Sequence, residues 1–299
     1  MLYDISMRLV ASYDPPANDG RYVVCMAPAD LPGRQRAITS LLTVDPRPIE
    51  RSDRTDFFGN AVVEVAFKSA HAEIAFAIRS RVDRTMPPAG PDISPPLSQL
   101  AEDIAVNRSL APSSPHHFLA ASPRVRLAPE FLDYARLNAG LGEGVAPGVT
   151  VRAIVEALGA AIHRDMTYDV GATSVDTRPE EAFAARHGVC QDYSHIMIAG
   201  LRSIGIPAGY VSGFLRTLPP PGQPRLEGAD AMHAWVRAWC GASAGWWEYD
   251  PTNAVPAGDS HIVVAYGRDY GDVAPVRGVL RSSGTQDTKD AVDVVPVDA

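Results

Sequence analysis

The sequence predicts an α+β protein in which an antiparallel, β-rich N-terminal region precedes a cluster of helices packed on a second antiparallel sheet. Three observations predict this fold class. Apolar and polar residues alternate over roughly the first eighty positions, which indicates half-buried strands. Helical spacing begins only after a proline-rich stretch, and more strand patterns follow a strongly apolar helix. The chain has 299 residues, which is long enough for two packed units.

Five strand patterns occupy the N-terminal region. They cover Leu2–Ala11, Arg21–Met26, Gln35–Val44, Ala61–Phe67 and His71–Ile78. Residues 15–20, with the sequence PPANDG, have turn composition and are predicted to separate the first two strands. The last two are separated by a short break at Ser69 and Ala70, which predicts a β-hairpin.

A proline-rich stretch, MPPAGPDISPP at residues 86–96, marks the change of structural class. Proline removes a backbone donor and holds the residue before it in an extended conformation, so this stretch is predicted to be a linker. We therefore divide the chain into a β-rich domain at 1–85, a linker and helical connection at 86–148, and a third unit at 149–299.

The second half of the chain reads as helices followed by strands. Helices are predicted at Phe131–Leu141, Val149–His163, Pro179–His187 and Cys190–Ile204. The last is apolar around most of its circumference, so we expect it to be buried, and Gly205 and Pro207 mark its end. Strands are predicted at Ala208–Leu215, Met232–Cys240, Gly245–Tyr249 and Ile262–Tyr266, and Ala291–Val297 is a candidate edge strand.

Charge and cysteine content exclude several classes of partner. The formal net charge is -8, with 35 acidic against 27 basic residues, and no Lys/Arg run could neutralise a track of phosphates, so nucleic acid and anionic membrane are not expected partners.

The N-terminus lacks a signal-peptide pattern, and no apolar run approaches ~20 residues, so we expect a cytoplasmic location. Three cysteines argue against a disulfide framework and leave at least one thiol without a partner in the same chain.

Three short segments place reactive residues on different elements: GVCQDY, MHAWV and EYDPTN. Cys190 opens the buried helix, where free N–H groups and the positive dipole end favour a thiolate and can hold an oxyanion. His233 lies on a strand, and Asp250 ends another immediately before Pro251. Two neighbouring antiparallel strands could bring the carboxylate and the imidazole together beside the helix. This predicts a nucleophile, a base and an orienting carboxylate.

Other histidines are weaker candidates for the base. His187 and His195 flank the thiol in sequence, but neither lies across from it on a separate element, as a proton acceptor should. The remaining five are expected to be structural: His71, His116, His117, His163 and His261.

The other cysteines and a metal site also have simpler interpretations. Cys25 and Cys240 are expected to be small core residues, as lone cysteines usually are. Cys240 also faces away from His233 along its strand. Asp192, in the first turn of the buried helix, is expected to complement the helix dipole. No paired spacing such as Cys-x-x-Cys or His-x-x-x-His occurs, so no metal site is predicted.

These segments resemble the transglutaminase-like superfamily, particularly its bacterial branch with an N-terminal β domain. The resemblance runs through Ala184–Phe214, Asp230–Trp239, Trp246–Asn253 and His261–Gly278, and is looser over Met1–Arg79. It implies a papain/transglutaminase-like catalytic core in which Cys190 is the nucleophile, His233 the general base and acid, and Asp250 its hydrogen-bond partner. Tyr168 resembles an aromatic position near the oxyanion in some members, although packing at a helix end is an equally plausible role.

The activity implied is acyl transfer through a cysteine thioester, with a peptide or protein as substrate and no cofactor. We favour hydrolysis over transfer to an amine, because water is always present and nothing marks a lysine-binding tunnel. Leu218–Gly228 is a candidate substrate-contacting loop, although its sequence favours a plain surface connection. The alternatives are an amine-transferring enzyme, a non-catalytic binding module that retains the fold, and a zinc-dependent hydrolase. The sequence carries no signal for the oligomeric state.

Overall fold

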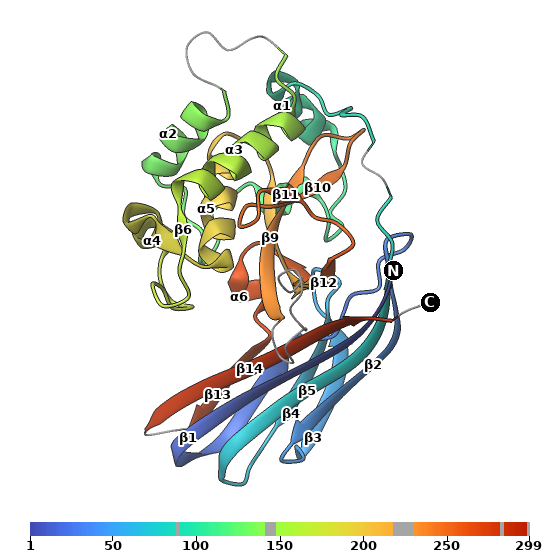
Figure 1. The fold of residues 1–299 in the computed structure, drawn as a ribbon, viewed down its shortest axis with the longest axis vertical. Coiled ribbons are helices and arrows are strands. Elements are labelled where there is room, and N and C mark those ends of the chain that lie inside the picture. The colour runs from blue at the N-terminus through green and yellow to red at the C-terminus, as the bar shows by residue number, and fades with distance from the viewer. Residues whose placement is uncertain (88–89, 141–147, 218–229, 282–283, 298–299) are drawn as a thin grey trace, which may run out of the picture.

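Strands from both ends of the chain build one seven-stranded antiparallel sheet, seen in the lower part of Figure 1. The computed structural model describes residues 1–87, 90–140, 148–217, 230–281 and 284–297. The strands of this sheet are β1 (Leu2–Val24), β2 (Gln35–Asp45), β3 (Glu50–Thr55), β4 (Ala61–Ala66), β5 (His71–Arg84), β13 (Val276–Arg281) and β14 (Thr285–Pro296). Their order is β2-β5-β1-β4-β3, and β13 and β14 both pair with β1.

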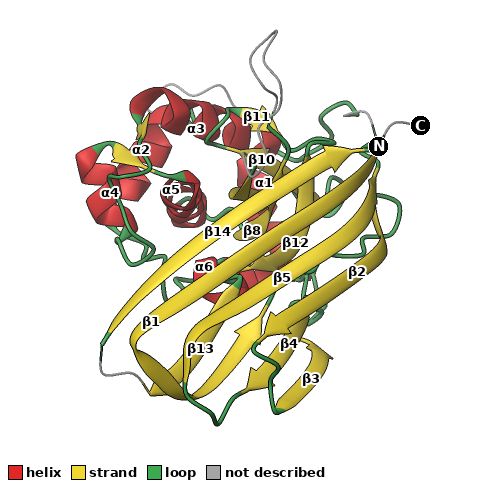
Figure 2. Cartoon of the chain, turned by 60° about the horizontal axis from the view of Figure 1, so that its bottom comes forward, coloured by secondary structure: helices red, strands yellow, loops and turns green. Residues whose placement is uncertain are grey.

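The long strand β1 joins two parts of this sheet. Its first half pairs with β5 and β14, and its last residues, Arg21–Val24, pair with β4 and β13. The pairing with β5 shifts register between Ser12 and Ala17, where Pro15 and Pro16 lack N–H groups for a regular ladder. The turn predicted at residues 15–20 is therefore wrong, because the chain remains extended there. Figure 2 shows β14, β1, β5 and β2 side by side as one broad layer.

The predicted hairpin between the fourth and fifth strand patterns is also wrong. Both strands exist as β4 and β5, but they pair with opposite halves of β1 and not with each other. A hairpin prediction assumes that consecutive strands are neighbours. Here the length of β1 allows the chain to cross between two parts of the sheet after β4.

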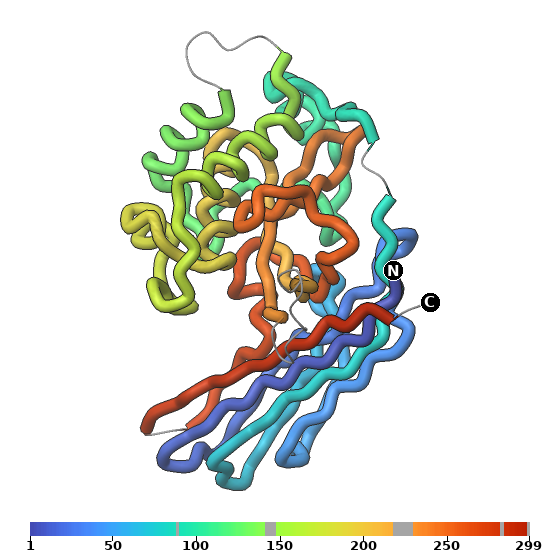
Figure 3. Tube along the Cα trace, viewed as in Figure 1, coloured from blue at the N-terminus to red at the C-terminus, as the bar shows by residue number. Residues whose placement is uncertain are grey.

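The end of the chain returns to the beginning. β14 runs antiparallel to β1 from the pair Tyr3 and Pro296 to the pair Asp14 and Thr285, and Figure 3 shows these blue and red segments lying together. Val292 and Val294 are fully buried in this position. The unit predicted at 149–299 thus contains two strands, β13 and β14, that belong to the same sheet as the N-terminal region.

A buried helix lies at the centre of the other part of the molecule (Figure 1). It is α5 (Cys190–Ser203), close to the predicted bounds, and Gly205 follows it with a positive φ of 84°. α2 (Pro129–Asn138), α3 (Val151–Asp165) and α4 (Pro179–Ala185) pack against α5. The remaining helices are α1 (Leu97–Val106), the 3-10 turn η1 (Pro115–Phe118) and α6 (Tyr270–Val273). None of the helices in the described ranges is long and apolar enough to span a membrane.

A five-stranded antiparallel sheet packs against α5. Its order is β11-β10-β9-β8-β12. The bounds are β8 (Ala208–Leu215), β9 (Ala231–Trp239), β10 (Trp246–Asp250), β11 (Val255–Pro256) and β12 (His261–Gly267). Two short segments, β6 (Thr167–Tyr168) and β7 (His187–Gly188), form a separate parallel pair before α5. The predicted α+β fold class is confirmed: one antiparallel sheet, then helices packed on a second.

The N-terminal region covers the outer edge of β12. The Gln35 side-chain amide donates to the Val263 carbonyl at 2.7 Å and accepts from the Val263 N–H at 2.9 Å. The Asn60 amide makes the same pair of bonds with the backbone of Tyr266, each 2.8 Å long. Arg34 also reaches the buried Glu248 carboxylate on β10 at 2.5 Å. These side chains replace a neighbouring strand and fix the second sheet against the first part of the chain.

Candidate active site

Cys190 begins α5 and is the one half-exposed thiol among the three cysteines. The first N–H groups of a helix have no acceptor within the helix, so they are available beside this thiol. Asp192 closes the turn, because its Oδ2 accepts from the Val189 N–H at 2.8 Å and from Thr173 Oγ1 at 2.7 Å. The sequence interpretation gave Asp192 a role at the helix start, and these bonds define it. The arrangement presents the thiol at an electropositive, accessible helix end.

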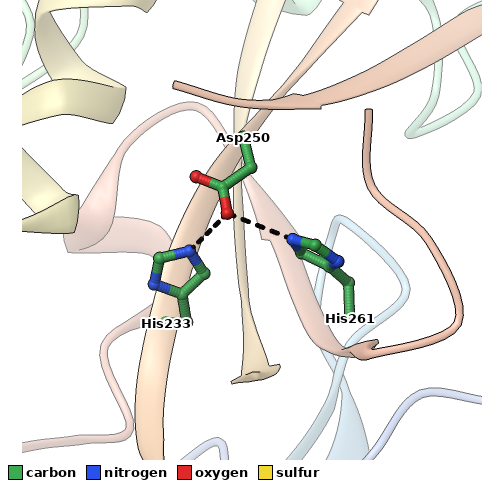
Figure 4. Close-up of side chains that lie close together, drawn as sticks. All are labelled: His233, Asp250 and His261. Carbon is green, nitrogen blue, oxygen red and sulfur yellow. Dashed lines mark hydrogen bonds and ion pairs between the residues drawn. The ribbon is translucent and has the colours of Figure 1, made fainter. Parts of the chain in front are cut away.

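His233 and Asp250 meet across neighbouring antiparallel strands. His233 Nε2 lies 2.8 Å from Asp250 Oδ2, and the two side chains are 8% and 0% exposed (Figure 4). Burial alone would raise the pKa of Asp250, but hydrogen bonds from His233, His261 and Asn253 outweigh it and hold that pKa well below its usual range. Asp250 is therefore a buried carboxylate that stays ionised.

The Asp250 carboxylate has donors on both oxygens. Oδ1 accepts from the backbone N–H groups of Thr252 and Asn253 at 2.9 and 3.2 Å. Oδ2 accepts from the Asn253 side chain at 2.7 Å, in addition to the two histidines. A carboxylate surrounded in this way has a fixed orientation and a fixed charge.

His233 connects the carboxylate to the thiol. Burial alone would lower its pKa, but hydrogen bonds with Asp250 and Cys190, and the charges of both, raise it to about 10. Since Nε2 faces Asp250, Nδ1 is the ring nitrogen left for Cys190. The raised pKa of His233 favours its positively charged form beside the thiol. The three residues that the sequence placed on separate elements come together in one site.

His261 was expected to be structural, but it contacts this site. Its Nε2 lies 3.1 Å from Asp250 Oδ2, the same oxygen that His233 approaches (Figure 4). Trp235 packs beside both histidines, with its ring 6.2 Å from that of His233 and 5.2 Å from that of His261. One sequence feature points to a functional role for His261: it begins a segment that resembles the transglutaminase-like superfamily.

The weaker candidates for the base bond to backbone groups elsewhere. His187 is exposed and bonds through Nδ1 to the Ala185 carbonyl at 2.8 Å. His195 is buried, and its Nε2 accepts from the Tyr270 N–H at 3.2 Å. Cys25 and Cys240 are both buried, as expected for core residues, and burial raises the pKa of each thiol to about 12. Neither thiol is suited to nucleophilic chemistry at neutral pH.

Tyr168 lies close to the thiol. The parallel pairing of β6 with β7 sets Tyr168 opposite Gly188, two residues before Cys190. Its side chain is 53% exposed, and burial of the remainder, followed by the charge of Cys190, raises its pKa. The ring centroid is 6.4 Å from that of Tyr193. The hydroxyl therefore remains protonated and can donate a hydrogen bond near the thiol. Leu218–Gly228, the candidate substrate-contacting loop, lies outside the described residues.

The donor atoms of His233, Asp250 and His261 could in principle hold a metal ion, since they lie within 4.8 Å of one another. Tetrahedral zinc, with bonds of about 2.0 Å, separates its ligand atoms by about 3.3 Å. Here the histidine nitrogens lie 2.8 and 3.1 Å from the carboxylate oxygen, which are hydrogen-bond distances. The geometry fits a charge network better than a metal centre.

A half-exposed cysteine at a helix start, packed on antiparallel strands that carry a histidine and an aspartate, defines a core of the papain and transglutaminase type. Comparison with known protein families shows to which superfamily this core belongs. The chain belongs to the transglutaminase-like superfamily: the Transglutaminase-like superfamily model matches residues 141–251, and the Bacterial transglutaminase-like N-terminal region matches residues 3–83. The resemblance predicted from the sequence is confirmed.

Relatives extend over nearly the whole chain. The uncharacterized protein Rv2569c of Mycobacterium tuberculosis is 38% identical over 272 residues, which cover 88% of this chain and 83% of the relative. The uncharacterized protein ML0607 of Mycobacterium leprae is 30% identical over 297 residues, covering 96% and 98%. A crystal structure of a candidate cysteine protease from Cytophaga hutchinsonii has a TM-score of 0.72 at 19% identity and covers all of this chain and 91% of its own. At that identity the likeness shows a shared fold.

Proposed function

We propose that this protein is a thiol-dependent acyl-transfer enzyme that hydrolyses amide or peptide bonds through a thioester on Cys190. The observation that carries the proposal is the buried 2.8 Å bond between His233 and Asp250, together with the coupling of His233 to the thiol at the start of α5. A buried histidine with a pKa near 10 is costly to maintain unless an adjacent negative charge compensates it. Such perturbed groups concentrate at functional sites.

The first half of the proposed reaction forms the thioester. The Cys190 thiolate attacks the substrate carbonyl carbon, and the N–H groups at the start of α5, with Tyr168 Oη as a further donor, stabilise the oxyanion. Bonding of the sulfur removes its negative charge, so one of the interactions that raises the pKa of His233 is lost. His233 thereby becomes a stronger acid and gives its proton to the leaving amine as the C–N bond breaks.

The second half releases the acid. Neutral His233 accepts a proton from a water molecule while that water attacks the thioester carbonyl. Collapse of the second tetrahedral intermediate breaks the C–S bond and restores the thiolate and imidazolium. Asp250 remains ionised throughout and keeps the imidazole in one orientation. A primary amine in place of water would give amine transfer by the same steps.

We propose a peptide or protein substrate and water as the acceptor. The half-exposed thiol supports this proposal, because a macromolecular substrate needs access from the surface. The net charge of -8 and the lack of a basic track make nucleic acid an unsuitable partner. We also propose a cytoplasmic location, since all three cysteines are free and a reducing compartment keeps them so.

A substrate screen tests the proposal. Purified protein is incubated with peptides and glutamine amides, with and without added primary amine, and products are identified by mass spectrometry. We expect hydrolysed product from the wild type and none from Cys190→Ala, whereas Cys25→Ala should retain activity. A chelator should leave turnover unchanged. Equal turnover in wild type and Cys190→Ala would refute the proposal, and absence of turnover across the screen would favour a binding module.

A further inference from the structure

His261 approaches Asp250 from the far side of the second sheet. β12, which carries His261, is separated from β10 by β9 and β8. The His261 side chain is nevertheless only 6% exposed. Its Nε2 lies 3.1 Å from Asp250 Oδ2, and Figure 4 shows the ring pointing toward that oxygen. The same oxygen therefore receives one histidine from each side.

The backbone fixes the tautomer of His261. The Gly258 N–H donates to His261 Nδ1 at 3.2 Å, so Nδ1 carries a lone pair and not a proton. The ring proton then resides on Nε2 and points toward Asp250. A proton on Nδ1 would face the Gly258 N–H, donor against donor. His261 is thus oriented to donate through Nε2 to the carboxylate.

Neighbouring groups prevent the His261 ring from turning away. Trp235 meets it edge-on, at 5.2 Å and 80° between the ring planes. Two residues along β12, Val263 is bonded through both its N–H and its carbonyl to the Gln35 amide of the N-terminal region. The position of His261 therefore depends on contacts made by the first part of the chain.

We infer that His261 is a positioning residue, an inference that rests on the proposed function. Its Nε2–H holds Asp250 Oδ2 where that oxygen can orient His233. Apart from the two histidines, the side-chain donor to this oxygen among the described residues is Asn253. Asn253 is exposed, so water competes for its hydrogen bond. His261 touches neither the thiol nor the reacting carbonyl, and it acts through Asp250.

Two substitutions at one position separate the hydrogen bond from the packing. His261→Phe keeps a ring against Trp235 but lacks the N–H, whereas His261→Gln supplies an amide N–H near the place of Nε2. We expect His261→Phe to lower kcat by about 10- to 100-fold with KM changed less than about twofold. His261→Gln should recover most of that loss. His116→Phe is the matched control, because His116 lies in η1 and bonds to the Asn107 carbonyl.

Ring-nitrogen NMR gives a readout that needs no turnover. Correlation spectra of histidine-labelled protein should show that the neutral His261 ring carries its proton on Nε2 and leaves Nδ1 bare. In His261→Phe the His233 nitrogen signals should shift, and in His116→Phe they should stay.

The outcomes separate the inference from the proposed function. Wild-type kcat in His261→Phe, a proton on Nδ1 of the neutral His261 ring, or an unchanged His233 spectrum in His261→Phe would each overturn the positioning role while leaving the thiol reaction intact. A wild type without Cys190-dependent turnover would overturn the function, and the NMR comparison would still decide whether His261 orients the pair. If His261→Phe does not fold, the wild-type spectrum decides: a neutral ring with its proton on Nε2 supports the role, and a neutral ring with its proton on Nδ1 overturns it.

Discussion

Iodoacetamide at about pH 6 should alkylate Cys190 long before the other two thiols. The thiolate is the reactive species, so the rate follows the ionised fraction. Burial raises the pKa of both Cys25 and Cys240 to about 12, and each side chain is 1% exposed. At pH 6 roughly one in 10⁶ of such thiols is ionised. Even before limited access is considered, their labelling should be negligible.

Cys190 differs because of its neighbour. His233, with a pKa of about 10, is protonated at pH 6 and supplies the positive charge that stabilises a thiolate. His233→Ala removes this charge. A nearby positive charge makes a cysteine more reactive, so we expect labelling of Cys190 to slow by about 10- to 100-fold in this variant.

Peptide mapping by mass spectrometry over a time course measures these rates, with residual activity followed in parallel. Protein unfolded in denaturant at higher pH is the control, since all three cysteines should then be labelled at similar rates. Labelling of Cys25 or Cys240 as fast as Cys190 in the native protein would contradict the burial argument. Native-rate labelling in His233→Ala would contradict the ion pair.

Three further predictions follow from the site. Asp250→Asn should lower kcat/KM by about 10²- to 10⁴-fold in steady-state assays, because the imidazolium loses its carboxylate, and wild-type rates would remove Asp250 from the proposed triad. Gly213→Ala should lower the free energy of unfolding by about 1–3 kcal/mol in denaturant titrations, because a Cβ there would lie 2.4 Å from the Trp235 ring. Gly90→Ala, which meets open space, is its control, and equal stability of the two variants would contradict the clash. The raised pKa of His233 contributes to the free energy of unfolding. This contribution is complete below about pH 6.5, the usual pKa of a histidine, and is lost as the pH rises to about 10. The melting temperature should therefore decline over that range more in wild type than in His233→Gln, and parallel curves would contradict the shift.

Local patterns predicted the elements that carry the site. The bounds of β8 agree with the predicted Ala208–Leu215, and α5 begins at Cys190 as expected. An apolar strand and a helix start are both encoded in adjacent residues, so short segments suffice to identify them. The meeting of His233 and Asp250 also followed from sequence, because their strands are consecutive and antiparallel.

The pairing of strands that lie far apart in the sequence was harder to predict. The chain separates β4 from β5 by four residues, yet each pairs with a different half of β1, which no local signal shows. His261 was missed for a related reason: two strands lie between β12 and β10, so its contact with Asp250 depends on the curvature and register of the whole sheet. Residues that act across several strands are visible only in three dimensions.

The return of β14 to β1 has a consequence for biosynthesis. A ribosome releases β1 first, but the strand that covers one of its edges emerges only after the whole helical core, including Cys190, has been made. Until then the nascent sheet exposes an unpaired edge and leaves open the positions that Val292 and Val294 fill. Closure over so long a sequence separation is intrinsically slow, and the partly made sheet is prone to aggregate. The residues of the thiol site are thus synthesised before the strand that completes the first sheet, and β14 is the element that closes the exposed edge of β1.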